Sequence, residues 1–224
     1  LFLSRETAFS FLLHPDLSPG ESCCLLLLFA AELQDLLDQE DAPGISRLSK
    51  SYSREKETLA SGLGNLLENS PPPAAPEETA GKLLGLFAGL EPLDTNWPQR
   101  LLSLRESLFA LLSKVREEPP KKAERFRAYK NLLVYFVYRY WMQSFFDGEI
   151  LPKAKLFAAS YFLIRLLDEA DRSLSSEISP EISIQNAKAF SKEVEYSEEN
   201  LSAFYTAAWE EDFLSLSSLF PLLL

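Results

Sequence analysis

The sequence contains few of the residues that build β-sheets. Only 10 of its 224 residues are Val or Ile, against 43 Leu. β-Branched side chains favour strands, whereas leucine keeps its rotamer freedom in a helix. No stretch alternates apolar and polar residues over the length of a strand, and no Asn-Gly or Asp-Gly turn joins two such stretches. The sequence therefore predicts an all-α fold, an irregular bundle of about seven to nine helices.

Positive charge is also scarce. The chain has 22 Lys and Arg residues against 33 Asp and Glu, which gives a net charge of -11. A protein that reads duplex DNA needs a basic face to neutralise phosphates. The cationic residues between positions 114 and 130 are interleaved with glutamates, a pattern typical of a solvated helix face. We therefore expect no nucleic-acid partner.

Metal ligands and reactive side chains are few. The two cysteines, Cys23 and Cys24, are adjacent, and neighbours on a helix point about 100° apart, so we expect no disulfide between them. We interpret them as packed core residues in a reducing compartment. The single histidine, His14, has no base or carboxylate at useful spacing, and we interpret it as a surface residue. No phosphate-binding loop, dinucleotide fingerprint or Ser/His/Asp order is present, and we expect no metal site.

Long hydrophobic runs are missing as well. No apolar stretch reaches the roughly 20 residues that cross a bilayer, and no basic segment precedes an apolar core as in a signal peptide. We expect no membrane partner and a cytoplasmic location. The chain begins at Leu1 rather than methionine, which suggests a fragment or a processed product. The oligomeric state stays open.

Proline and capping residues divide the chain into helices. Ser18, Pro19 and Glu21 form a capping box that opens one helix, and Ala42-Pro43-Gly44 is expected to end it. The first helix is expected to have Ser4 as its N-cap. Helices are expected over residues 5–13, 45–69, 77–90, 98–117, 120–146, 152–172, 180–195 and 198–210.

A proline-rich stretch at residues 70–76 is the clearest candidate for a linker. It would separate an N-terminal helical hairpin region, residues 1–69, from a C-terminal helical bundle, residues 77–224. The alternative is a surface crossing within one domain, in which the two regions pack together.

The residues 132–142 are apolar or aromatic almost all round and predict a buried aromatic helix at the centre of the fold. Residues 156–164 predict the helix that packs against it. Arg139 lies within the first of these segments and Arg165 directly follows the second. An unpaired buried guanidinium is very costly, so each needs a carboxylate, a carbonyl or a bound anion.

Four residues of these two helices are therefore candidates for a ligand pocket: Arg139, Arg165, Tyr135 and Tyr161. The structural alternative for the arginines is an internal ion pair, for example with Asp168 or Glu169. For the tyrosines it is aromatic packing.

Residues 187–201 read Ala-Lys-Ala-Phe-Ser-Lys-Glu-Val-Glu-Tyr-Ser-Glu-Glu-Asn-Leu. This segment resembles the closing motif of the flagellin lysine-N-methylase family, in which a Ser-x-x-Ile/Val-Glu-His-type segment follows two apolar helices. Residues 129–135 and 160–167 resemble those two helices. Residues 5–37 resemble the helical pair that follows the family's cysteine motif. The resembling segments cover roughly half of the chain, in the order of the family.

The resemblance implies part of a lysine N-methyltransferase, with S-adenosylmethionine as methyl donor and flagellin as partner. Family members carry an upstream cysteine cluster thought to hold iron–sulfur or another metal. This chain lacks that cluster, so the metal is expected only in an upstream region absent from it, and Tyr196 stands where the family pattern usually has histidine. The resemblance identifies no catalytic residue.

Within the resembling segment, Glu193, Glu195 and Tyr196 are candidates for binding the substrate lysine. A carboxylate beside a lysine binds its ammonium group but raises its pKa, whereas methyl transfer needs the neutral amine. These carboxylates therefore suit recognition better than activation. The alternative function is a non-enzymatic helical protein-interaction domain, which a packed core with internally paired arginines would favour over a pocket.

Overall fold

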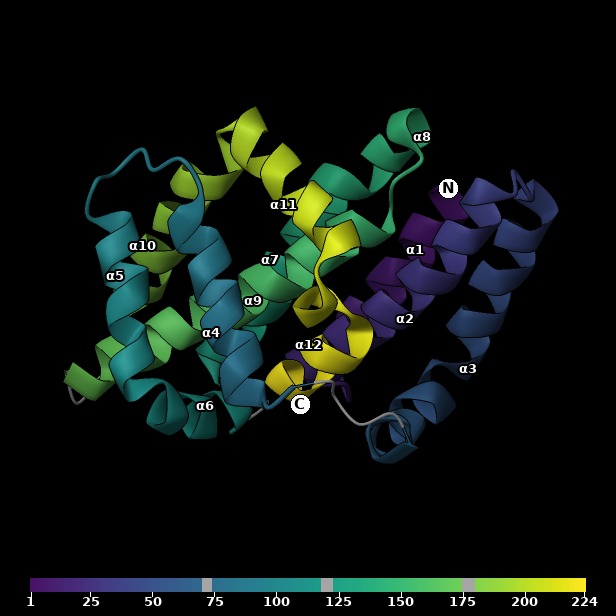
Figure 1. Ribbon diagram of the computed structural model, residues 1–224. Helices are drawn as coiled ribbons and strands as arrows, with labels where there is room; N and C mark the ends of the chain where they lie inside the picture. The colour runs from purple at the N-terminus through teal and green to yellow at the C-terminus, as the bar shows by residue number, and fades with distance from the viewer. Residues whose placement is uncertain (70–73, 118–122, 175–179) are drawn as a thin grey trace. The chain divides into compact units, whose positions relative to one another are not determined.

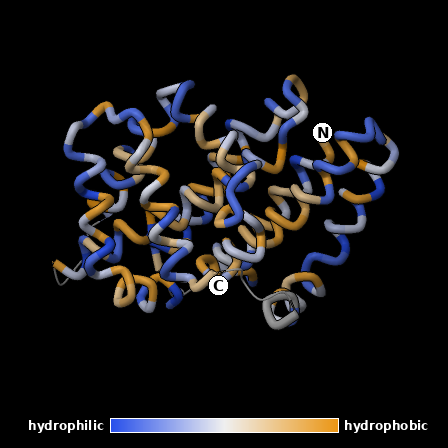
Figure 2. The backbone as a smooth tube through the Cα atoms, in the orientation of Figure 1, coloured by the Kyte–Doolittle hydropathy of each residue, from blue (hydrophilic) through white to orange (hydrophobic). Residues whose placement is uncertain are grey.

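The computed structural model describes residues 1–69, 74–117, 123–174 and 180–224. All regular secondary structure in these ranges is helical, which confirms the all-α prediction (Figure 1). Hydrophobic and hydrophilic residues alternate in short blocks along the helices (Figure 2), as expected for helices that each bury one face.

The chain divides into two compact units that are discontinuous in sequence. The first unit comprises Leu1–Pro71, Glu118–Ala158 and Leu223–Leu224, and the second comprises Pro72–Glu117 and Ala159–Leu222. The expected N-terminal region lies within the first unit. Residues 70–73 of the expected linker lie outside the described residues, so the division at the proline stretch stays a prediction.

Helix α9 begins in the first unit and continues into the second. The other helices of the first unit, and then those of the second, have the following bounds. The first unit contains α1 (Phe2–Leu12), α2 (Pro19–Asp38), α3 (Ala42–Asn69), α7 (Glu124–Tyr140), the 3₁₀ turn η2 (Trp141–Gln143), α8 (Ser144–Asp147) and the start of α9 (Leu151–Leu174). The second contains α4 (Pro76–Gly89), α5 (Trp97–Ser103), the 3₁₀ turn η1 (Leu104–Ser107), α6 (Leu108–Arg116), α10 (Pro180–Phe190), the π-helical segment η3 (Ser191–Glu195), α11 (Glu198–Glu210), the 3₁₀ turn η4 (Asp212–Leu214) and α12 (Leu216–Leu223).

The capping box predicted for α2 is present. The Ser18 hydroxyl accepts a hydrogen bond from the Glu21 amide at 3.0 Å, and the Glu21 carboxylate accepts one from the Ser18 amide at 2.7 Å. The N-cap predicted at Ser4 is wrong, because α1 begins at Phe2. The Ser4 hydroxyl is buried and accepts instead from the Trp141 indole at 3.0 Å.

The prediction that Ala42-Pro43-Gly44 ends α2 is also wrong. Helix α2 ends at Asp38, and the chain turns through Glu40, whose φ of 54° lies in the left-handed region. The Asp41 carboxylate then accepts a hydrogen bond from the Gly44 amide at 2.9 Å. Since aspartate is a favoured cap and proline fits a first helical turn, these residues open α3.

The aromatic helix α7 is buried on one face only. Phe136 and Tyr140 are buried and stack on Phe157 of α9, with ring centroids 5.6 and 6.2 Å apart. Tyr138, in contrast, is 72% exposed. The helix buried on all sides is its neighbour α9, in which every residue from 152 to 169 is buried. The sequence identified the two core helices but not which of them is more deeply enclosed.

Two of the expected helices are interrupted. The helix predicted over residues 98–117 divides into α5 and α6 around the 3₁₀ turn η1. The helix predicted over residues 180–195 ends as a regular α-helix at Phe190 and continues as the π-helical η3. Neither change leaves a composition signal, because both segments retain ordinary helical residues.

A buried glutamine on α2 holds the turn that leads into α9. The Gln34 side-chain oxygen accepts hydrogen bonds from the Ile150 and Leu151 amides at 2.8 and 3.1 Å. Its amide nitrogen donates to the Gly148 carbonyl at 2.9 Å. Gly148 adopts φ 74°, which confirms its predicted role as a left-handed cap. Gln34 therefore supplies the partners that the first amides of α9 cannot find within their own helix.

We predict that Gln34→Ala lowers the free energy of unfolding by about 2–3 kcal/mol, because buried backbone groups lose their hydrogen-bond partners. Urea denaturation followed by circular dichroism would measure this loss. Gln143→Ala, at an exposed glutamine on η2, is the matched control and should change stability by less than about 0.5 kcal/mol. Equal effects of the two substitutions would show that Gln34 does not anchor α9.

Candidate functional site

The segment that resembles a family motif contains the π-helical η3. The Tyr196 amide donates to the Ser191 carbonyl at 3.2 Å, an i to i+5 hydrogen bond that marks a π-helical turn. Glu193 and Glu195 are only 2% and 5% exposed, whereas Tyr196 is 71% exposed. Such turns often occur at functional sites. Among the three predicted substrate-binding residues, the tyrosine is the one that lies open to a partner.

Glu193 binds a distant loop. One carboxylate oxygen accepts from the Leu93 amide at 2.7 Å, and the other accepts from the Asp94 amide at 3.0 Å. Asn200 of α11 adds to this contact, since its side chain both accepts from and donates to the backbone of Glu91 at 2.9 Å. Both oxygens of Glu193 are therefore engaged in holding the α4–α5 loop. Its role in binding lysine stays a prediction.

The cap predicted at Ser197 is confirmed, because its hydroxyl accepts from the Asn200 amide at 3.1 Å. Asn200 thus joins the start of α11 to the Glu91 backbone. Sequence reasoning missed this link, since the two ends lie 109 residues apart and an asparagine near a helix start has an ordinary capping role.

The four ligand-pocket candidates fall in different units. Tyr135 and Arg139 belong to the first unit, and Tyr161 and Arg165 to the second. Arg139 is exposed on α7, and its guanidinium carbon lies 5.3 Å from the centre of the Tyr140 ring and 6.0 Å from that of Tyr135. This geometry is a surface cation–π contact.

Arg165 is buried and caps the end of α6. It donates to the Tyr161 hydroxyl at 2.7 Å, to the Val115 carbonyl, and to the Glu117 carbonyl at 3.3 Å. These carbonyls lie at the negative end of the α6 dipole, where a cation is favourable. Arg165 and Tyr161 are 2% and 0% exposed. They therefore pack as part of the core of the second unit.

The carboxylates proposed as alternative partners of Arg165 have contacts of their own. Asp168 accepts from Ser183 at 2.9 Å and from Asn186 at 2.8 Å, and both donors belong to α10. Asn186 also accepts from Arg100 of α5 at 2.5 Å. Glu169 binds Arg172 at 3.1 Å. This buried polar network joins α5, α9 and α10 within the second unit.

The interpretation of His14 as a surface residue is wrong. Its side chain is only 12% exposed, and Nε2 lies 3.3 Å from a carboxylate oxygen of Glu57. Nδ1 accepts from the Asp16 amide at 3.3 Å. The carboxylate lies 43 residues away on α3, so no local pattern could have shown this pair.

Cys23 and Cys24 are free, buried thiols. Burial raises the pKa of the Cys23 thiol, which keeps it protonated and unreactive. In the part of the chain that the structure describes, no group of three or more His, Cys, Asp and Glu side chains is placed to hold a metal ion. Within the same residues, no helix combines the length and the apolar character needed to cross a membrane.

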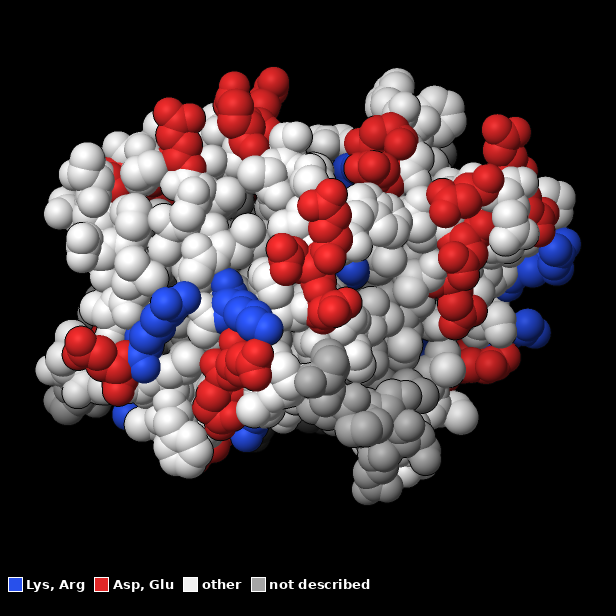
Figure 3. All heavy atoms as spheres, viewed as in Figure 1, with Lys and Arg blue, Asp and Glu red and all other residues white. Residues whose placement is uncertain are grey.

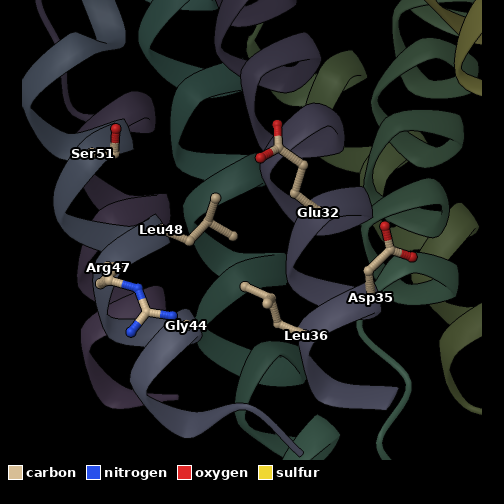
Figure 4. Close-up of a pocket in the computed structure, with 7 residues that line it drawn as sticks. All are labelled: Glu32, Asp35, Leu36, Gly44, Arg47, Leu48 and Ser51. Atoms are coloured by element: carbon tan, nitrogen blue, oxygen red, sulfur yellow. The ribbon is translucent and has the colours of Figure 1, made fainter. Parts of the chain in front are cut away.

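A hollow of about 460 Å³ lies between α2 and α3, within the first unit (Figure 4). Leu36 and Leu48 face each other across it, and the Glu32 side chain extends from α2 beside them. The Asp35 carboxylate points away from α3. The residues that line the hollow are Glu32, Asp35, Leu36, Gly44, Arg47, Leu48 and Ser51.

The polar side chains of this hollow already have partners on the protein. The Tyr52 hydroxyl donates to Glu32 at 2.5 Å, and Arg47 lies 3.4 Å from the Asp41 carboxylate. Ser51 donates to Glu55 at 3.0 Å. Burial and the Glu32 carboxylate together raise the pKa of Tyr52, which keeps its hydroxyl a proton donor. The hollow therefore offers an oriented carboxylate next to an apolar wall.

Acidic side chains also predominate over basic ones on the face drawn in Figure 3. This distribution agrees with the net charge of -11. A surface of this kind favours cationic partners over anionic ones, although it specifies no particular protein.

Comparison with protein-family models gives a match over nearly the whole chain. The model described as "FliB lysine N-methylase C-terminal domain" matches residues 5–222. The match confirms the resemblance found at residues 187–201 and extends it to segments that carry no recognisable motif. No curated protein and no solved structure matches the chain.

We predict that Glu193→Ala accelerates hydrogen exchange at the Leu93 and Asp94 amides by about tenfold or more, because both amides lose their acceptor. Glu210→Ala, at an exposed carboxylate of α11, is the control and should leave both rates unchanged. Exchange measured by NMR would decide the role of Glu193. Unchanged rates in the Glu193 variant would mean that the carboxylate does not hold the loop.

We also predict that iodoacetamide labels Cys23 and Cys24 at least about a hundredfold more slowly in the native chain than in the unfolded chain, because native labelling requires opening of the core. Mass spectrometry with and without urea would measure the two rates. Comparable rates would contradict the burial of these thiols.

Proposed function

Because the chain belongs to the family of FliB lysine N-methylase C-terminal domains, we propose that it forms the helical part of an enzyme that methylates flagellin lysines with S-adenosylmethionine. The observation that carries this proposal is the extent of the family match, residues 5–222. We further propose that the enzyme acts in the cytoplasm, since the free thiols of Cys23 and Cys24 fit a reducing compartment.

The described residues suit recognition and support better than proton abstraction. A lysine amine must lose a proton before it can attack a methyl group, and a neighbouring carboxylate opposes that loss. Glu193 holds backbone amides and Arg165 holds backbone carbonyls. Tyr196 and the α2–α3 hollow stay accessible, so the proposal assigns contact with the protein substrate to such exposed features.

The hollow between α2 and α3 does not fit S-adenosylmethionine. A nucleoside-bearing ligand needs a few convergent polar groups for its hydroxyls and its amino-acid end, with an apolar or aromatic surface for its base. The donors Arg47 and Ser51 are engaged with Asp41 and Glu55, and no aromatic side chain lines the hollow. We therefore assign no methyl-donor site to these residues.

One observation favours a second function, that of a non-enzymatic helical interaction domain. Arg165 and Tyr161, two of the expected pocket residues, are packed against the end of α6 and against each other. A domain that only presents surfaces to a partner would have such a filled core.

The test is intact-mass spectrometry of flagellin incubated with S-adenosylmethionine and the 224-residue chain. The product of the complete gene is assayed in parallel, and a reaction without the methyl donor serves as control. We expect mass increments of one CH₂ group per methylation, because a methyl group replaces a proton. Peptide mapping then locates the increments on lysine residues.

Increments with the gene product or with the chain support the proposed function. Increments with the chain alone would further place the whole active site within these 224 residues. If neither preparation modifies flagellin, while an established lysine methyltransferase does modify the same sample, the methylase proposal fails. The interaction-domain function is then preferred.

A further inference from the structure

The α2–α3 hollow combines an apolar wall with a carboxylate of fixed orientation. Leu36 and Leu48 are half-buried and face each other across it (Figure 4). The four methylene groups of a lysine need such a surface, since long cationic side chains bury their stems and keep the charged end near water. The hollow is also open, so a side chain from another protein can enter it from solvent.

Glu32 is the group that would meet the ammonium ion. The hydroxyl of Tyr52, which is 6% exposed, donates to its Oε1 atom at 2.5 Å. The ring of Tyr52 is itself fixed, because it lies 5.1 Å from that of Phe29 in the core of the first unit. Glu32 is thereby oriented before any ligand arrives, which reduces the entropy lost on binding.

The one cation in the hollow is directed elsewhere. Arg47 is exposed and pairs at 3.4 Å with Asp41, the residue that caps α3. Asp35 adds a second negative charge on the α2 side. Two carboxylates and one already paired guanidinium leave the hollow with an excess of negative charge. Its charge is complementary to a cation, and an anionic ligand would be repelled.

From this charge complementarity and the apolar wall, we propose that the α2–α3 hollow is a docking site for a lysine side chain of the protein substrate. The choice of lysine among alkylammonium groups rests on the proposed function. The docked lysine is not the methyl acceptor, because Glu32 stabilises its protonated form. It positions the substrate by binding next to the lysine that reacts.

The experiment is an NMR titration of the full 224-residue chain with Nα-acetyl-lysine methylamide. The norleucine analogue, which has an apolar side chain without the ammonium group, is titrated in parallel. Glu32→Gln removes the charge and retains an oxygen that can accept from Tyr52. Glu40→Gln is the matched control, since it removes a charge from the same helical hairpin outside the hollow.

We expect the lysine ligand to cause saturable shifts at the Leu36 and Leu48 amides. Glu32→Gln should weaken its binding about fivefold, whereas Glu40→Gln should change it less than about twofold. Arg47→Gln should strengthen binding, because it removes a competing cation. The norleucine analogue should bind at least about fivefold more weakly than the lysine ligand.

Three results would overturn the proposal: no saturable shifts at Leu36 and Leu48, equal binding of the norleucine analogue, or unchanged binding by a folded Glu32→Gln variant. The flagellin assay is independent of this titration. Methylation of flagellin without lysine binding in the hollow would refute the docking site alone. Lysine binding without methylation would refute the methylase function and leave the docking site supported.

Discussion

The first amide groups of a helix have no acceptor within that helix, and both units of this protein depend on how those groups are satisfied. In the first unit, Gln34 of α2 accepts from the two amides that open α9. In the second, Glu193 and Asn200 bind the backbone of the loop that leads into α5. A side chain from a distant helix thus fixes where a buried helix or an exposed loop begins. The aromatic cores can then pack in one register.

This constraint also determines which polar residues are left for function. Glu193 lies in the segment with the strongest family resemblance, yet both of its carboxylate oxygens contact backbone amides. Arg165 lies in the helix that the sequence marks as central, and it satisfies carbonyl groups at the end of α6. A buried charge needs such partners, since leaving it unpaired would cost several kcal/mol. The groups accessible to a partner are at the surface, among them Tyr196 and Glu32.

A family match that spans the chain, combined with a largely structural use of its buried charges, indicates a supporting part in lysine methylation. Glu32 and Tyr52 illustrate the distinction between recognition and chemistry. Their hydrogen bond orients a carboxylate that can hold an ammonium group. The same carboxylate would oppose the deprotonation that methyl transfer requires. Recognition of one lysine and reaction at another would resolve this conflict.

The sequence by itself determined the fold class, most helix positions and the family. The scarcity of β-branched residues, the capping box at Ser18 and the left-handed cap at Gly148 are local signals, and each was confirmed. The family resemblance likewise depends on residue order along the chain. These features need no knowledge of which segments lie together in space.

Tertiary structure alone decided the partners of the polar residues. His14 meets Glu57 across 43 residues, and Glu193 meets Leu93 across 100. The same composition that predicts a helix over 180–195 also permits the π-helical turn at its end. The hollow beside Glu32 forms because α2 and α3 fold back on each other, which brings Leu36 opposite Leu48. Such pairings depend on the packing of whole helices, and helical periodicity records only which face is buried.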